Sequence, residues 1–125
     1  MKTESRKQQD KLWKLCKVIT LNKYGNTCYT CSRTNLEGSN CQLGHFLPSG
    51  ACGAFLRYDL RNLRIQCYHC NINLGGNGAE YYQRMVTEIG QRKVNQLFKD
   101  KQKSVKATDH YAKLITEYEL LIEEL

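Results

Sequence analysis

The chain has 125 residues, of which 41% are hydrophobic, and a formal net charge of +7. This length is enough for a single domain, residues 1–125, with a modest core, and it excludes two independently folded domains. The chain has no run of about 18 apolar residues, which excludes a typical membrane-spanning helix and predicts a soluble protein without a membrane partner.

The positive charge is concentrated in the first 107 residues. Residues 1–25 carry seven Lys and Arg against two acidic residues, and residues 78–107 carry seven against three. Residues 108–125 carry one lysine against five acidic residues. Because Lys and Arg that neutralise phosphates release counterions, a polyanion is the natural partner of such a basic body. A merely soluble surface explains the charge equally well, so the chemistry of the site has to decide.

A basic helix is expected over residues 1–25. Apolar side chains recur at helical spacing from Leu12 to Ile19, among several lysines, and Gly25 supplies a helix stop. Cys16 lies on this apolar stripe, so we interpret it as a core residue rather than a metal ligand.

The helical period disappears in the central block, residues 26–78. Gly, Asn and Ser become frequent, and three short pieces read as strands: Cys41–Leu47, Phe55–Tyr58 and Leu63–Gln66. The only proline, Pro48, lies in the loop after the first of these pieces. We therefore expect the β part of the fold in this block.

The same block holds two C-x2-C pairs with the spacing of zinc knuckles. The cysteines of the two pairs are Cys28, Cys31, Cys67 and Cys70. A structural zinc ion takes four ligands in a tetrahedron, and thiolates suit it. Since the seven cysteines are an odd number and no secretory signal is evident, we expect a reducing compartment and metal rather than disulfides. We predict one structural Zn²⁺ bound by all four thiolates, with Cys41 and Cys52 as packing thiols.

Three helices are expected after the central block. Apolar spacing within residues 79–107, which are basic, predicts helices over Ala79–Ile89 and Gln91–Lys101. An acidic helix is predicted over residues 108–125, with Thr108 as its N-cap and an apolar stripe along one side. That stripe must pack either on the N-terminal helix or on a second copy in a homodimer, and two heptads are too few to choose between them.

The polar residues between the two cysteine pairs follow an informative order. They are Gly44, His45, Arg57, Asp59, Asn62, Gln66 and, directly after the last cysteine, Asn71. A histidine that ends one strand, an asparagine near the next strand and an asparagine after it resemble the ββα-metal fold of HNH endonucleases. The longer string G-H-F-x-P, L-R-Y-D-x-R-N, I-Q-C-x2-C-N and L-x-G-N resembles the NinG/Rap family of phage recombination proteins, over about Cys28 to Leu97.

The resemblance implies a fold and a function. The expected fold class is α+β, with a small HNH-like ββα-metal core and a structural zinc, flanked by an N-terminal helix and C-terminal helices. The implied activity is that of a structure-specific DNA endonuclease that cuts branched recombination intermediates such as D-loops and four-way junctions. The implied setting is the cytoplasm of a bacterial host, with the gene carried by a phage or prophage.

Several residues have expected roles in such a reaction. Phosphodiester hydrolysis needs an activated water and a cation, and His45, neutral near pH 7, is the best candidate to take the proton of the water. The resemblance implies that Asn71 offers its carbonyl oxygen to Mg²⁺ or Mn²⁺. Asn62 is expected to brace the loop that carries His45. The arginines that can bind phosphate oxygens are Arg57, Arg61 and Arg64.

Gly44 departs from the pattern of many HNH nucleases, which carry an acidic metal ligand just before the base histidine. The NinG-like pattern also has glycine there, so the second protein ligand is left open: His45 itself could bind the cation, or Asp59 could approach it. Two other functions also stay open. One is a zinc-knuckle module that binds nucleic acid without cleaving it, and the other is a site-specific HNH nuclease, for which no major-groove reader can be identified.

Overall fold

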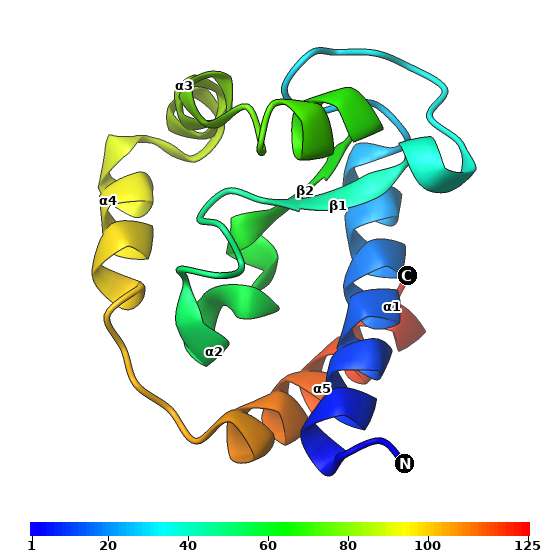
Figure 1. Ribbon diagram of the computed structural model, residues 1–125, viewed down its shortest axis with the longest axis vertical. Helices are drawn as coiled ribbons and strands as arrows, with labels where there is room; N and C mark the ends of the chain where they lie inside the picture. The colour runs from blue at the N-terminus through cyan, green and yellow to red at the C-terminus, as the bar shows by residue number, and fades with distance from the viewer.

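The computed structural model describes residues 1–125 and contains helices and a two-stranded sheet, which confirms the α+β class. In chain order the main elements are α1 (Glu4–Tyr24), β1 (Gln42–His45), α2 (Gly53–Arg57), β2 (Leu63–Gln66), α3 (Gly78–Ile89), α4 (Gln91–Asp100) and α5 (Ala107–Glu123). Three short turns add η1 (Gly38–Asn40), η2 (Leu60–Asn62) and the π-helical η3 (His69–Asn73). The hairpin lies in the centre, with α1 and α5 on one side and α3 and α4 on the other (Figure 1).

The long helix α1 lies within the predicted residues 1–25 and ends at the predicted glycine stop. Thr3 Oγ1 accepts a hydrogen bond from the Arg6 amide at 3.2 Å, which satisfies one free donor of the first turn. Gly25 ends the helix with a φ of 71°, a conformation that suits glycine. No helix of the structure is both long and apolar enough to span a bilayer.

The acidic helix α5 packs on α1 (Figure 1). Its buried residues are Tyr111, Leu114 and Tyr118, and Glu119 pairs with Lys11 of α1 at 3.2 Å. The apolar stripe therefore has a partner within the chain, while a homodimer stays a prediction. The expected N-cap was wrong: Lys106 occupies the cap position without a side-chain bond, and Thr108 lies inside the first turn.

The hairpin places His45 at a strand end. Strands β1 and β2 pair antiparallel, with Leu43 opposite Ile65 and His45 opposite Leu63. Both strands fall within the predicted pieces, but the third predicted strand, Phe55–Tyr58, was wrong because its first residues belong to α2. In this short helix Leu56 is fully buried, and the Phe55 ring stacks on His110 at 5.2 Å. These helical contacts bury the apolar side chains without a partner strand.

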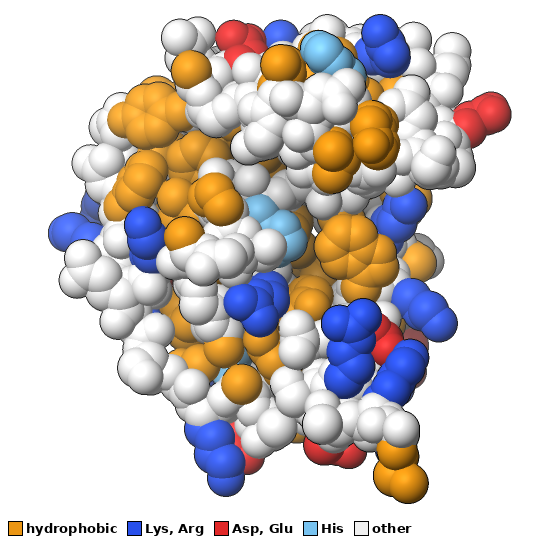
Figure 2. All heavy atoms as spheres, viewed as in Figure 1, with side chains coloured by type: hydrophobic (Ala, Val, Ile, Leu, Met, Phe, Trp, Pro, Cys, Tyr) orange, Lys and Arg blue, Asp and Glu red, His pale blue; other side chains and the backbone are white.

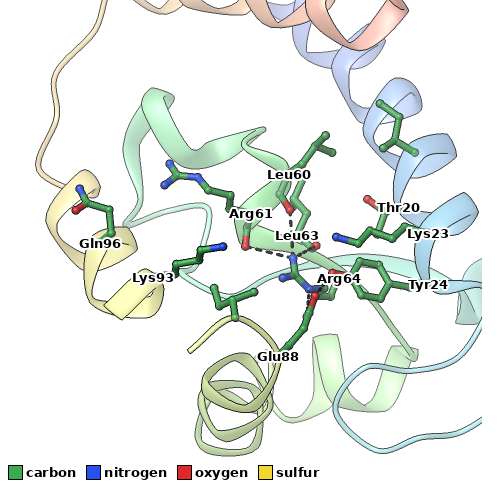
Figure 3. Close-up of a pocket in the computed structure, with 12 residues that line it drawn as sticks. Thr20, Lys23, Tyr24, Leu60, Arg61, Leu63, Arg64, Glu88, Lys93 and Gln96 are labelled. Carbon is green, nitrogen blue, oxygen red and sulfur yellow. Dashed lines mark hydrogen bonds and ion pairs between the residues drawn. The ribbon is translucent and has the colours of Figure 1, made fainter. Parts of the chain in front are cut away.

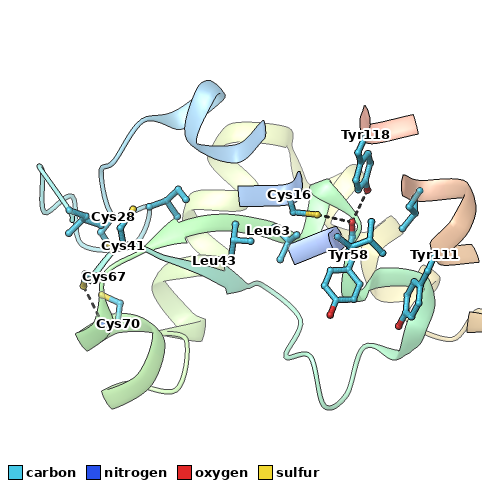
Figure 4. Close-up of a cluster of buried hydrophobic side chains, with 14 residues drawn as sticks. Cys16, Cys28, Cys41, Leu43, Tyr58, Leu63, Cys67, Cys70, Tyr111 and Tyr118 are labelled. Carbon is cyan, nitrogen blue, oxygen red and sulfur yellow. Dashed lines mark hydrogen bonds between the residues drawn. The ribbon is translucent and has the colours of Figure 1, made fainter. Parts of the chain in front are cut away.

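The buried side chains form two clusters. The larger has 14 residues and joins the hairpin to α1 and α5 (Figure 4). Three of the four cysteines of the C-x2-C pairs lie at one end of it and three tyrosines at the other. The smaller has eight residues and lies under α2, α3 and α4. Cys16, Cys41 and Cys52 are buried in these clusters, as expected of packing thiols. The helices α3 and α4 meet at Gly90, as predicted.

Candidate metal and catalytic site

Four thiols meet at one end of the hairpin. The Sγ atoms of Cys28, Cys31, Cys67 and Cys70 all lie within 4.8 Å of one another. The sulfurs of Cys31 and Cys67 are 3.7 Å apart, and a tetrahedral zinc site with bonds of about 2.3 Å needs sulfur separations of about 3.8 Å. The four cysteines could therefore hold one zinc ion, as the sequence predicts, and their soft sulfurs are unsuited to Mg²⁺.

The backbone of the two cysteine turns fixes the thiols to the hairpin. In the first turn the Tyr29 amide donates to the carbonyl of Ile65 in β2, at 2.8 Å. In the second, the Cys70 amide donates to the Cys67 sulfur at 3.4 Å, and Asn71 lies next to Cys70 within η3. A metal bound here would hold the segment that carries Asn71 against β2.

His45 has one ring nitrogen occupied and one free. Its Nε2 lies 2.7 Å from the backbone oxygen of Arg57. Because a carbonyl oxygen only accepts hydrogen bonds, Nε2 carries the proton in the neutral ring and Nδ1 keeps its lone pair. Burial lowers the pKa of His45 below its ordinary value, and the charge of Arg57 acts in the same direction, against the hydrogen bond to the carbonyl. The ring is thus a neutral base at pH 7.

Asn62 is a positioning residue for the loop after His45. It is fully buried, and its Oδ1 accepts from the Leu47 amide at 2.7 Å. Its Nδ2 donates to the carbonyls of Leu47 at 3.1 Å and Leu56 at 3.3 Å. These bonds use both ends of its amide, so Asn62 joins the loop after His45 to α2.

The side-chain carbonyl oxygen of Asn71 is free of hydrogen bonds within the protein. Its Nδ2 donates to Gln42 Oε1 at 2.8 Å, three residues before His45 on β1, while its Oδ1 accepts no hydrogen bond from the protein. The chain then returns toward His45, because a Cβ built on Gly76 would lie 4.0 Å from the His45 carbonyl. The segment from Asn71 to Gly76 therefore runs along β1, the strand that ends in His45.

Gly44 is required by a neighbouring glutamine. A Cβ at position 44 would lie 1.8 Å from Gln66 Oε1, and Gln66 is fully buried. Gln66 Nε2 donates to Thr30 Oγ1 at 3.0 Å and to the Gly76 carbonyl at 2.9 Å, so its amide cannot swing away without losing both bonds. Gln66 thus occupies the space that an acidic side chain at position 44 would need. The sequence analysis missed this role of Gln66, for which the only signal was the glycine at position 44.

Gly44→Asp is expected to destabilise the protein rather than to add a metal ligand. The new side chain would overlap Gln66 and leave the hydroxyl of Thr30 and the carbonyl of Gly76 without their donor, at a cost of about 2–4 kcal/mol. Urea unfolding would measure the loss. Gly50→Asp is the matched control, because a Cβ at Gly50 meets nothing within 4 Å. Equal stability of the two variants would contradict this account.

The three predicted DNA-contacting arginines have different environments. Arg64 is only 3% exposed and pairs with Glu88 at 3.1 Å, so it is not the free surface arginine that the sequence analysis expects. Arg61 pairs with Asp59 at 2.7 Å and with Asp100 at 2.9 Å. These bonds also occupy Asp59, which the sequence analysis considered as a second cation ligand. Arg57 has no acidic partner, and its Nη2 donates to the Ser49 carbonyl at 3.0 Å.

The chain matches the family described as "NinG: Bacteriophage Lambda NinG protein" over residues 2–125. The chain belongs to the NinG family. The match includes the N-terminal helix and the acidic tail, both of which lie outside the resemblance seen in the sequence motifs.

Curated NinG relatives come from several phages. "Protein ninG" of Escherichia phage 933W is 31% identical over 70 residues, which is 56% of this chain and 33% of the relative. "Protein ninG" of Salmonella phage P22 is 26% identical over 98 residues, 78% of this chain and 47% of the relative. The NinG protein of Escherichia phage lambda is 30% identical over 70 residues, 56% of this chain and 33% of the relative. The chain thus spans a third to a half of these NinG proteins. No solved structure is significantly similar to it.

Proposed function

We propose that this NinG-family protein is an HNH-type endonuclease that hydrolyses phosphodiesters in branched DNA with a divalent cation. The observation that carries the proposal is His45, a neutral histidine at a strand end whose Nε2 is held by the Arg57 carbonyl and whose Nδ1 is free. Two antiparallel strands, followed by a cysteine turn and Asn71, support an HNH-like ββα core around it.

In the proposed reaction His45 Nδ1 takes the proton of a water whose oxygen bonds to phosphorus, while the bond from phosphorus to the leaving oxygen breaks. The Arg57 carbonyl, 2.7 Å from Nε2, orients the ring and stabilises the imidazolium that forms. Asn71 Oδ1 is the oxygen that would hold Mg²⁺ or Mn²⁺, which when bound neutralises charge on the phosphate. Arg57, the arginine without an acidic partner, would contact the strand beside the site.

The distribution of charge supports branched DNA as the substrate. Positive residues are in excess on α1 and on α4, which flank the hairpin on opposite sides (Figure 1). On the face in Figure 2 the Lys and Arg side chains are spread over several elements instead of forming one strip. A partner with arms in more than one direction could meet both flanks at once, whereas a straight duplex would meet fewer of them.

A second candidate is a zinc-knuckle protein that binds nucleic acid without cleaving it. Tyr68, within the second cysteine turn, is 47% exposed and could stack on an unpaired base. Incubating the protein with a labelled four-way junction, a flap and a linear duplex, each with Mg²⁺, Mn²⁺ or EDTA, separates the two functions. Metal-dependent cleavage of the branched substrates supports the nuclease. Binding of all three without cleavage would reject it.

The pH dependence of cleavage should follow the depressed pKa of His45. A base works only when unprotonated, so the rate should rise with pH through a midpoint below the ordinary value of 6.5 and be flat above pH 7. The same shift makes folding stability fall as the pH drops from 6.5 through the folded pKa, because the unfolded chain binds the proton more tightly. Single-turnover rates from pH 5 to 8 test the midpoint, and a midpoint above 7 would contradict it.

A further inference from the structure

A cavity of about 430 Å³ lies between α1, the segment from η2 to β2, and the helices α3 and α4. None of the zinc cysteines lines it, and neither does His45, Asn62 or Asn71. Figure 3 looks into this cavity and shows side chains that enter it from α1 on one side and from α4 on the other. It is therefore a separate feature from the candidate catalytic site.

Three cations converge in the cavity. The side chains of Lys23 and Lys93 point into it from opposite sides, toward the guanidinium of Arg64 (Figure 3). Arg64 is neutralised by Glu88, but neither lysine has an acidic partner within 4.0 Å. The two exposed, unpaired lysines repel each other, and an anion bound between them would remove that repulsion.

The central cation is held in place by the protein. Arg64 Nη1 donates to the carbonyls of Leu60 at 3.2 Å and Leu63 at 2.8 Å, and its guanidinium lies 5.0 Å from the centre of the Tyr24 ring. Glu88 accepts hydrogen bonds from the hydroxyls of Tyr24 and Tyr29. Burial opposes the charge on Glu88, but these hydrogen bonds and Arg64 together lower its pKa. The ion pair of Arg64 and Glu88 is therefore held in position by the protein itself.

The cavity also has an apolar part, which comes from Ile19, Leu60, Leu63, Ile89 and the ring of Tyr24. Thr20, Gln96 and Arg61, which is paired with Asp59 and Asp100, complete the lining. A bare phosphate would leave the apolar part without a contact, whereas a sugar and base attached to the phosphate would cover it. The volume falls in the ordinary range of small-molecule sites, about 300–1,000 Å³.

We propose that the cavity binds one nucleotide of a DNA strand, with the phosphate between Lys23 and Lys93 and the sugar and base against the apolar lining. The proposal rests on DNA as the partner but not on cleavage. A paired, stacked nucleotide cannot enter such a cavity, whereas a nucleotide at a branch or in a single strand can. The cavity would thus make the protein prefer branched over linear DNA, apart from the chemistry at His45.

A mononucleotide titration tests the site directly. Adding dTMP to the zinc-loaded protein in EDTA-free buffer without Mg²⁺ should shift the NMR signals of the methyl groups of Leu60, Leu63 and Ile89. The double variant K23Q/K93Q should weaken the binding at least tenfold. The control K7Q/K99Q removes the same charge from exposed positions on the same two helices and should bind like the wild type. No saturable binding of dTMP, or equal effects of the two double variants, would overturn the proposal.

Two further experiments distinguish a nucleotide site from a phosphate site and from non-specific electrostatic binding of DNA. Inorganic phosphate should compete with dTMP only weakly, and equal affinity of the two would reject the nucleotide. In Ca²⁺ buffer without cleavage, K23Q/K93Q should lose affinity for a four-way junction but not for a linear duplex, with a salt slope shallower by about 1. Equal losses for both DNAs would reject the branch preference. Since no cleavage is measured, these results stand even if the protein proves not to be a nuclease.

Discussion

His45→Ala is expected to lower the rate of junction cleavage by about 10²- to 10⁴-fold, the usual contribution of a positioned general base. The variant removes the free Nδ1 while leaving the strand pair of His45 with Leu63 unchanged. Binding of the junction in Ca²⁺ buffer should be retained, because the imidazole is neutral and contributes no charge to DNA affinity. The loss should therefore be in the single-turnover rate rather than in the dissociation constant.

The control is His69→Ala. His69 is exposed, lies in the second cysteine turn, and makes its one side-chain contact with Asn73 at 3.3 Å. This variant should cleave at the wild-type rate, so a loss confined to His45→Ala separates base chemistry from a general effect of removing an imidazole. Partial restoration of the His45→Ala activity by added imidazole would support proton transfer. Undiminished cleavage by His45→Ala would reject His45 as the base.

The parts of the structure that depend on short-range pattern could be predicted from the sequence. The helical stripe around Cys16 predicts α1, and the glycine stop at Gly25 predicts its end at Tyr24, because spacing and capping act locally. The grouping of the four thiols could also be predicted, because each C-x2-C turn brings two sulfurs together and one zinc ion takes four ligands. The tautomer of His45 could not be predicted, because it depends on a carbonyl 12 residues away.

The features that the sequence analysis missed depend on the tertiary contacts of individual side chains. Phe55 and Leu56 suit a strand as well as a helix, and only the packing of Leu56 and of the Phe55 ring decides for α2. Arg64 reads as a surface arginine, yet Glu88 and two tyrosine rings lie around it and bury it. The glycine at position 44 could be seen in the sequence, but the glutamine that fills its space could not, since it comes from the other strand.

Cys70→Ser is expected to unfold the protein, as is removal of zinc by a strong chelator. Structural zinc sites contribute apparent binding free energies of about 10–16 kcal/mol, which is as large as or larger than the whole stability of a domain, about 5–15 kcal/mol. In this chain the second cysteine turn follows β2 directly and Asn71 lies next to Cys70, so the loss should reach the candidate catalytic residues. Circular dichroism would follow the unfolding, and metal analysis should find about one zinc per folded chain.

Cys52→Ala is the matched control for that experiment. Cys52 is as buried as Cys70 but belongs to the smaller core cluster and is not one of the four grouped thiols. Its loss removes one sulfur from the packing and should cost about 1 kcal/mol while zinc is kept. Adding Zn²⁺ to the chelated wild type should restore the fold, and adding Mg²⁺ should not, because thiolates bind hard cations poorly. A folded, zinc-free wild-type protein would contradict the assignment of zinc as the scaffold that positions His45 and Asn71.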